Sequence, residues 1–260
     1  MARRWALILG VSSGLGAASA RALAAAGYDI LGLHLDRRAT MPAVEALVAE
    51  LLAMGRQVRF WNENAADDER RATIVEAIAG EVGDSGVSVF LHSLAFGTLK
   101  PLVAPSPGGG ISRRQLEMTQ DVMANSLIYW VGALVDRGLL QAGGRVFAFT
   151  SEGSHRAATG YGAVGAAKAA LEAYIRQLAF ELAPRQITAN AIQAGVTDTP
   201  ALRKIPGHEQ IIEATLRRNP HGRLTCPEDV AAALVELARP GTHWMTGNVI
   251  RVDGGEDVSG

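Results

Sequence analysis

The stretch Trp5–Gly16, WALILGVSSGLG, is an apolar run that ends in three closely spaced glycines. Such a run, followed by Ala-rich sequence, predicts a strand that turns directly into a helix. Gly10 lets the chain leave the strand, Gly14 removes a Cβ where backbone must approach a phosphate, and Gly16 lets the helix pack closely on the sheet. The free N–H groups of the helix N-terminus favour an anion there, although a tight turn without a ligand is the alternative. The predicted phosphate loop is formed by Gly10, Ser12, Ser13, Gly14, Leu15 and Gly16.

The rest of the chain repeats this alternation of strand and helix. The predicted strands span residues 5–9, 30–35, 58–61, 87–91, 145–149, 187–192 and 248–252. The predicted helices span residues 14–26, 41–54, 67–82, 112–140, 157–182 and 227–238. Strands separated by helices favour parallel pairing with right-handed crossovers. The sequence therefore predicts an α/β fold, a Rossmann-type doubly wound seven-stranded parallel sheet with helices on both faces, in one domain over residues 1–260.

Two segments break the alternation. Residues 96–111 contain three prolines and a glycine triplet, and we expect a surface loop near the site. Residues 197–220 are polar, contain three prolines, and are predicted to be irregular with short helical pieces. Loops of this kind at the carboxyl edge of a sheet commonly carry specificity. Residues 197–220 are therefore predicted to be a substrate lid, with a plain surface excursion as the alternative.

The composition excludes several classes of protein. With 48% hydrophobic residues and a formal charge of −1, the chain can bury a core and has no broad field for nucleic acid or an anionic membrane. No apolar run reaches 18 residues, so no membrane span is predicted. The single cysteine, Cys226, excludes an intrachain disulfide, and the histidine spacing predicts no metal site. The basic start Met1–Arg4 could begin a secretory signal, but the strand and glycine turn explain the next residues better, so we expect a cytoplasmic enzyme.

Charged residues follow the second predicted strand. His34 stands near the strand end, and Asp36, Arg37 and Arg38 come next. A carboxylate there would accept hydrogen bonds from the ribose hydroxyls of NAD, whereas arginines would meet the 2′-phosphate of NADP. Two guanidinium groups favour NADP(H) over NAD(H). A solvated loop that contacts no cofactor is the alternative.

A tyrosine and a lysine indicate the chemistry. Tyr161 stands seven residues before Lys168 in the predicted helix 157–182, so both side chains are expected on one face. The chain has only four tyrosines and three lysines, so this spacing is uncommon by chance. A tyrosyl hydroxyl near an ammonium group stabilises negative charge on a carbonyl oxygen, and the ammonium group can also hold ribose hydroxyls. Two ordinary helix residues are the alternative.

These motifs resemble the short-chain dehydrogenase/reductase superfamily over nearly the whole chain. The G-x-x-x-G-x-G spacing is similar to its glycine motif. Tyr-x6-Lys resembles the enoyl-acyl-carrier-protein reductase branch, whereas ordinary members of the superfamily have Tyr-x3-Lys, which is absent here. The stretches 91–96 (LHSLAF) and 194–199 (AGVTDT) resemble segments of that branch, and 246–255 resembles the last strand of the superfamily. One departure is Ser151, which stands where the branch has a second Tyr.

The resemblance implies roles for individual residues. Tyr161 would hydrogen-bond the substrate carbonyl and stabilise an enolate, and Lys168 would hold the nicotinamide ribose. Asn125 would order the active site, and Ser151 would stand beside Tyr161. The cofactor contacts implied besides the phosphate loop and Lys168 are His34, Arg37, Arg38, Asn64, Ala65, Ser93, Ala95, Gly195, Thr197 and Thr199. The resemblance also implies a homotetramer built from the long helices and the last strand.

Two reactions fit these residues. The first is reduction by NAD(P)H of the C=C bond of an enoyl thioester or related α,β-unsaturated carbonyl, on a small molecule or on a carrier. The second is a carbonyl/alcohol oxidoreductase of the ketoreductase type, which a serine beside Tyr161 would suit. A protein that binds the dinucleotide without turnover is disfavoured, because it would need neither Tyr161 nor Lys168.

Overall fold

The computed structural model of the chain describes residues 3–104 and 106–259. Its strands are β1 Trp5–Leu9, β2 Asp29–His34, β3 Val58–Asn62, β4 Val87–His92, β5 Leu140–Ser151, β6 Thr188–Ala194 and β7 Val249–Val252. Its α-helices are α1 Gly14–Ala25, α2 Met41–Ala53, α3 Asp68–Val82, α4 Arg113–Gln120, α5 Ser126–Asp136, α6 Gly162–Leu182, α7 His208–Arg218 and α8 Pro227–Leu237.

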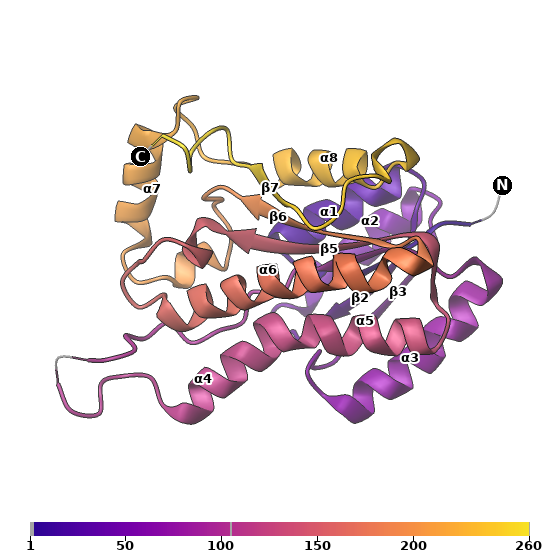
Figure 1. Ribbon diagram of the computed structural model, residues 1–260, viewed down its shortest axis with the longest axis horizontal. Coiled ribbons are helices and arrows are strands. Elements are labelled where there is room, and N and C mark those ends of the chain that lie inside the picture. The colour runs from indigo at the N-terminus through magenta and orange to yellow at the C-terminus, as the bar shows by residue number, and fades with distance from the viewer. Residues whose placement is uncertain (1–2, 105, 260) are drawn as a thin grey trace.

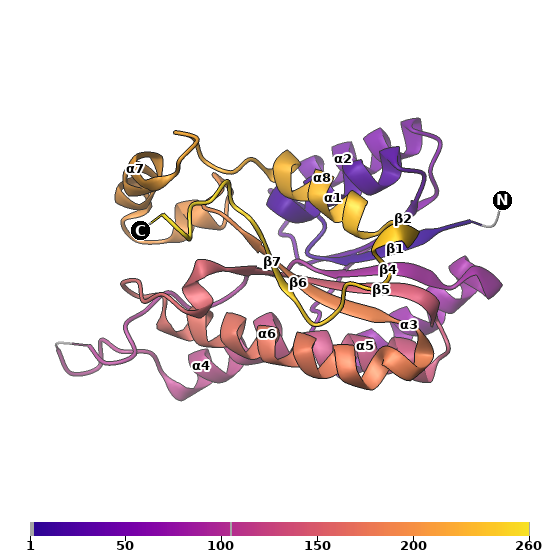
Figure 2. The same cartoon turned by 45° about the horizontal axis from the view of Figure 1, so that its top comes forward.

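The strands form one parallel sheet in the order β3-β2-β1-β4-β5-β6-β7. Helices α1, α2 and α8 cover one face, and α3, α4, α5 and α6 cover the other (Figure 1, Figure 2). This confirms the predicted doubly wound fold. The direction of winding reverses between β1 and β4, and a crevice opens outside the carboxyl ends of the strands at such a reversal.

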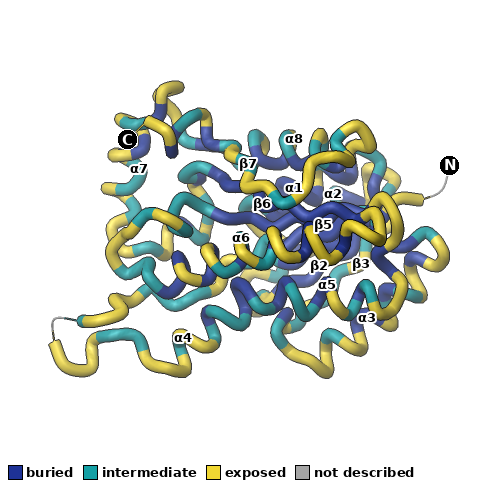
Figure 3. Tube along the Cα trace, in the orientation of Figure 1, coloured by how far each residue is buried: buried dark blue, intermediate teal, exposed yellow. Residues whose placement is uncertain are grey.

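Two hydrophobic cores hold the layers together, one on each face of the sheet. In β1, Leu7 and Leu9 point into the core under α3, α5 and α6, whereas Ala6 and Ile8 point into the core under α1, α2 and α8. This alternation is the period of two expected of a strand covered on both faces. The buried central strands and exposed outer helix faces are visible in Figure 3. Because both faces of the sheet are covered by apolar residues, polar functional groups are expected at the ends of the strands.

The helix predicted over 112–140 is wrong in its details. The structure has α4, a π-helical turn over Asp121–Asn125, and then α5. The helix ends at Asp136 because Gly138 takes a left-handed φ of 71°. Strand β5 then begins at Leu140 rather than 145. A π-turn inserts an extra residue into the helix, and periodicity alone does not reveal where.

Two other predicted boundaries differ. Helix α6 begins at Gly162, because residues 157–161 form a turn, so Tyr161 caps the helix instead of lying within it. The segment 197–220 contains a continuous 11-residue helix, α7, which lies beside the C-terminal residues in Figure 1. Among the helices of the described ranges, none combines the length and apolar character needed to cross a membrane.

Candidate active site

The glycine loop between β1 and α1 is closely packed against its neighbours. Gly10 has a φ of 83°, and a Cβ there would overlap the carbonyl oxygen of Ser93. A Cβ on Gly16 would overlap the carbonyl oxygen of Gly10. The Ser13 side chain forms no capping hydrogen bond at the start of α1. The first N–H groups of α1 are therefore available to a phosphate, as the sequence predicts.

Segments after β4 and β6 meet this loop. The Ser93 N–H group donates to the Leu9 carbonyl oxygen at 2.9 Å, which seats the segment after β4 beside the loop. A Cβ on Gly14 would lie 3.3 Å from Cγ2 of Thr199, which comes from the segment after β6. The structure therefore brings both Ser93 and Thr199 against the glycine loop.

Thr199 is held there by the turn that precedes it. A Cβ on Gly195 would lie 2.9 Å from Oε2 of Glu256, so the turn packs directly on the C-terminal segment. The Thr197 hydroxyl donates to the Gly195 carbonyl oxygen at 2.8 Å, and Thr197 is buried. Gly195 and Thr197 therefore shape the turn, whereas Thr199 faces the glycine loop.

Asp36 links the end of β2 to the glycine loop. Partial burial opposes ionisation, but hydrogen bonds from Ser12, Thr40 and His34 lower the pKa of the Asp36 carboxyl group. Burial also lowers the pKa of His34, although Asp36 lies 3.0 Å from its Nδ1. The carboxylate is therefore charged at neutral pH, and the imidazole is neutral.

Asn62 holds the same turn by two backbone hydrogen bonds. Its Oδ1 accepts from the Asp36 N–H group at 2.8 Å, and its Nδ2 donates to the Asp36 carbonyl oxygen at 2.9 Å. Arg37 and Arg38 follow as exposed residues, and within residues 3–104 and 106–259 neither forms an ion pair. The two guanidinium groups remain available beside the adenosine end of the predicted site.

Tyr161 lies at the end of β5. Its hydroxyl oxygen is 3.3 Å from Ser151 Oγ, and its ring packs so closely on Gly153 that a Cβ there would overlap it. Burial raises the pKa of Tyr161, while the hydrogen bond with Ser151 opposes that rise. The phenol is thus a neutral hydrogen-bond donor at physiological pH. Gly165 has no room for a side chain, because a Cβ there would overlap the carbonyl oxygen of Gly153.

Lys168 is buried beside the same strand. Its Nζ donates to the carbonyl oxygens of Phe149 at 2.7 Å and of Leu94 at 3.4 Å. Burial lowers the pKa of Lys168 to about 8, although Glu172 raises it. An ammonium group has three N–H donors, so one remains for a ligand. Tyr161 and Lys168 therefore converge on the last residues of β5 from different positions on the chain.

Asn125 ends the π-helical turn, and its side chain is anchored. Its Oδ1 accepts a hydrogen bond from the Tyr174 hydroxyl at 2.9 Å. Tyr174 lies on α6, the helix that also carries Lys168. The π-turn therefore fixes Asn125 against the helix of the candidate site, which agrees with a role in ordering that site.

Comparison with known proteins identifies the family of this arrangement. The family model described as enoyl-(acyl carrier protein) reductase matches residues 10–256. The chain belongs to this family of short-chain dehydrogenases/reductases. The resemblance seen in the motifs is thereby confirmed, and the protein is an NAD(P)H-dependent oxidoreductase.

Individual relatives differ in their reactions. The chain is 33% identical over 258 residues to an uncharacterized oxidoreductase of Mycobacterium tuberculosis, covering 96% of this chain and 90% of that one. It is 29% identical over 263 residues to a 3-oxoacyl-(acyl-carrier-protein) reductase of Pseudomonas aeruginosa, covering 98% of this chain and 97% of that one. The crystal structure of an enoyl-(acyl-carrier-protein) reductase (NADH) of Aquifex aeolicus has a TM-score of 0.86 at 23% identity, covering 99% of this chain and 97% of that one. This last likeness concerns the fold.

For three further residues predicted to touch the cofactor, the described part of the structure shows no contact with the glycine loop. The Asn64 side chain accepts from the Ala66 N–H group at 3.0 Å and so closes the turn after β3. The carbonyl oxygen of Ala65, a buried residue, accepts from Trp130 Nε1 at 2.9 Å. Ala95 is exposed in the segment after β4. Their contacts with a dinucleotide stay predictions.

The sequence did not predict a cluster of ion pairs that joins α7 and the C-terminal segment. Arg218 at the end of α7 lies 2.8 Å from both Glu152 Oε2 and Glu256 Oε1. Asp257 is buried and forms ion pairs with Arg156 at 3.0 Å and Arg251 at 2.9 Å. Burial raises its pKa, but hydrogen bonds from His155 and Gln193 outweigh that effect and lower the pKa to about 2. Arg218 and Glu152 are 66 residues apart, and Arg156 and Asp257 are 101 apart, so no local pattern reveals these pairs.

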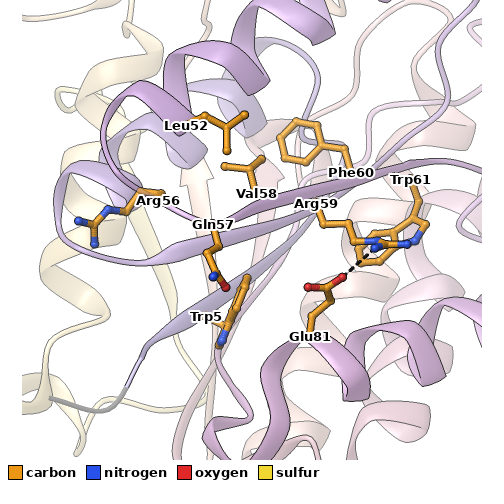
Figure 4. Close-up of a pocket in the computed structure, with 9 residues that line it drawn as sticks. All are labelled: Trp5, Leu52, Arg56, Gln57, Val58, Arg59, Phe60, Trp61 and Glu81. Carbon is orange, nitrogen blue, oxygen red and sulfur yellow. Dashed lines mark hydrogen bonds and ion pairs between the residues drawn. The ribbon is translucent and has the colours of Figure 1, made fainter.

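A separate hollow of about 600 Å³ lies at the opposite end of the sheet (Figure 4). Trp5 at the start of β1, residues of β3, and Glu81 on α3 line it. Arg59 in this hollow is already paired with Glu81 at 2.8 Å and stacked over Trp61 at 5.6 Å. The functional residues converge at the carboxyl ends of the strands, so this hollow is not the active site.

Proposed function

We propose that the protein reduces the C=C bond of an enoyl thioester or related α,β-unsaturated carbonyl compound. The observation that carries this proposal is the place of Tyr161. The tyrosine seven residues before Lys168 reaches the end of β5, whereas the position of the tyrosine in a Tyr-x3-Lys pair, four before Lys168, holds Val164, which is buried in the hydrophobic core. This arrangement supports the Tyr-x6-Lys chemistry of the matched family.

The chemistry requires a donor at the substrate carbonyl. The bound NAD(P)H supplies hydride to the β-carbon, and negative charge then develops on the carbonyl oxygen. Tyr161 is a neutral donor, because burial raises the pKa of its hydroxyl. One well-placed donor to such an oxygen contributes on the order of 3 kcal/mol. Lys168 holds the nicotinamide ribose with its remaining N–H donor and places positive charge nearby.

Carbonyl reduction is the second candidate, and Ser151 favours it. Its Oγ lies 3.3 Å from the Tyr161 hydroxyl oxygen, so a ketone oxygen could receive hydrogen bonds from both. In that reaction the Tyr161 proton would pass to the alkoxide formed by hydride transfer.

Parallel assays with crotonyl and acetoacetyl thioesters separate the two candidates. We expect NADPH consumption with crotonyl thioester, on coenzyme A or on acyl carrier protein, to exceed that with acetoacetyl thioester. Turnover of only the keto compound would establish the second reaction instead. Ser151→Ala provides a check: it should leave enoyl reduction within a few-fold but reduce keto turnover strongly.

NADP(H) is the proposed cofactor. Arg37 and Arg38 are exposed and unpaired within the described ranges, whereas the Asp36 charge is already engaged by Ser12, Thr40 and His34. The two guanidinium groups attract a 2′-phosphate.

Opposite shifts in cofactor preference are expected from two neighbouring substitutions. Arg37→Ala should weaken NADPH binding several-fold more than NADH binding, because one attraction to the 2′-phosphate is lost. Asp36→Asn should strengthen NADPH relative to NADH, because a repulsive charge is lost. Dissociation constants measured by quenching of protein fluorescence test both, and equal effects of Arg37→Ala on the two nucleotides would contradict the proposal.

The segment 197–220 is proposed to act as the substrate lid. Arg218 fastens its helix α7 to Glu152, which follows β5, and to Glu256 of the C-terminal segment. Glu152 stands next to Ser151, so the Arg218–Glu152 ion pair connects the proposed lid with the part of the site that contains Ser151 and Tyr161.

Loss of the ion pairs of Arg218 with Glu152 and Glu256 should weaken substrate binding. We expect Arg218→Ala to raise KM for the acyl substrate several-fold, with a smaller change in kcat, because the lid is ordered less often. Arg217→Ala is the control, because Arg217 pairs with Glu213 on the exposed side of the same helix. Equal KM values in the two variants would remove Arg218 from substrate binding.

A cytoplasmic homotetramer is proposed as the working assembly, without nucleic acid or membrane partners. Large apolar side chains are exposed near the last strand: Trp244 is 89% exposed, and Phe180 on α6 is 77% exposed. Contacts between copies would remove this apolar surface from water. Light scattering on the purified protein measures the mass, and a monomer at micromolar concentration would contradict the assembly.

A further inference from the structure

Glu172 lies one helical turn beyond Lys168 on α6, with its carboxylate fixed to the sheet. Its Oε1 accepts a hydrogen bond from the Thr150 hydroxyl at 2.6 Å. Thr150 is buried in β5 and stands between Phe149, which accepts from Lys168, and Ser151, which reaches Tyr161. The Thr150–Glu172 contact therefore joins α6 to β5 between the two contacts that place the candidate catalytic residues.

The buried ammonium group of Lys168 needs a nearby negative charge that does not use its remaining N–H donor. Burial penalises its charged form, and within the described part of the chain no carboxylate lies within ion-pair distance of its Nζ. A direct ion pair would use the N–H donor that a ribose hydroxyl requires. A carboxylate that is nearby but already bonded to Thr150 supplies negative charge and leaves that donor free.

The other titratable groups around Lys168 supply no negative charge. From β4, His92 is neutral, because burial and the charge of Lys168 lower its pKa to about 3. At the start of α6, Tyr161 is neutral, because burial raises its pKa. The group that raises the pKa of Lys168 is Glu172.

We propose that Glu172 is a positioning residue for the reaction: its carboxylate, fixed to β5 by Thr150, keeps Lys168 charged while leaving an N–H donor for the nucleotide ribose. The inference rests on the proposed role of Lys168. Its chemical consequence is a pH dependence. Removal of the negative charge should lower the pKa of Lys168, so that Lys168 loses its proton at a lower pH. A nearby opposite charge typically changes a pKa by about one unit or more.

The test measures nucleotide affinity rather than turnover. NADPH binding is followed by its fluorescence between pH 6 and 9 for the parent protein and for Glu172→Gln, whose carboxamide can still accept from Thr150. We expect the affinity to fall at a pH about one unit lower in Glu172→Gln than in the parent protein. At pH 8 the variant should bind several-fold more weakly, whereas at pH 6 the two should agree within two-fold.

Two further variants make the result specific. Glu181→Gln is the matched control, because Glu181 lies on the exposed side of α6 and accepts only from Gln177 there; its pH profile should follow that of the parent protein. Lys168→Met should bind weakly at every pH and lose the fall in affinity near pH 8, because the titrating group is gone.

Three outcomes would overturn the inference. They are an unshifted profile for Glu172→Gln, an equal shift for Glu181→Gln, and a loss of affinity in Glu172→Gln that is the same at every pH, which would indicate a structural role only. Failure of the proposed function is a different result: the parent protein would bind no dinucleotide, or Lys168→Met would bind as well as the parent.

Discussion

Tyr161→Phe is expected to keep dinucleotide binding and to lower kcat at least ten-fold, and on the order of 100-fold if the carbonyl oxygen is held by this hydroxyl alone. The substitution removes one oxygen atom from a ring that packs on Gly153, so the fold should be unchanged. The lost donor matters only when charge develops on the substrate oxygen, so kcat should fall rather than the affinity for substrate alone. Steady-state kinetics with crotonyl thioester and NADPH measure the effect.

A second tyrosine serves as the control. Tyr28→Phe changes a buried phenol at the start of β2, on the other face of the sheet, and should leave kcat within two-fold. If Tyr161→Phe also retained full turnover, Tyr161 would have no part in either proposed reaction. A residual rate that depends on Ser151 would indicate that the serine donates in its place.

Gly16→Ala is expected to abolish measurable dinucleotide binding and to destabilise the protein by about 2 kcal/mol or more. The new Cβ would overlap the carbonyl oxygen of Gly10, and it would also lie 3.3 Å from Oγ of Ser93. Both neighbours belong to the packed floor of the phosphate loop, so α1 must move away from the sheet. Thermal unfolding with and without NADPH measures both effects: the melting temperature should fall, and the added nucleotide should no longer raise it.

Gly132→Ala is the matched control for this prediction. Gly132 is an exposed glycine within α5, and a Cβ there would meet nothing within 4 Å. Alanine should stabilise the helix by about 0.5–1 kcal/mol and leave nucleotide binding unchanged. Should Gly16→Ala bind NADPH normally, the glycine loop would not be the phosphate site.

The candidate residues at the carboxyl edge of the sheet could be predicted because the motifs that contain them are short stretches of sequence. The glycine spacing from Gly10 to Gly16 and the distance from Tyr161 to Lys168 are short, and each lies where a helix begins beside a strand. Ser93 and Thr199 are predicted from the resemblance of residues 91–96 and 194–199 to the superfamily, and the structure places both after strands, β4 and β6. In a parallel sheet these strand ends must share one edge.

Helix interiors and long-range partners were not predictable. The π-turn at Asp121–Asn125 follows from packing on α6, and the sequence around it has an ordinary helical pattern. Arg218 depends on carboxylates 66 and 38 residues away. Glu172 is the exception that could have been noticed, because it stands four residues after Lys168 on a predicted helix. Its role depends on Thr150, however, which only the pairing of α6 with β5 brings near.

The amino-acid sequence by itself determined the doubly wound sheet, and it predicts the phosphate loop and the tyrosine–lysine pair, because each of these depends on the spacing of residues close together in the chain. The tertiary structure alone decided that the Asp36 charge is engaged at the glycine loop, that Lys168 is buried with one donor free, and that α7 is fastened to the C-terminal segment. Burial and charge compensation depend on groups that meet only after the chain folds, and they set protonation states and motions that no local pattern contains.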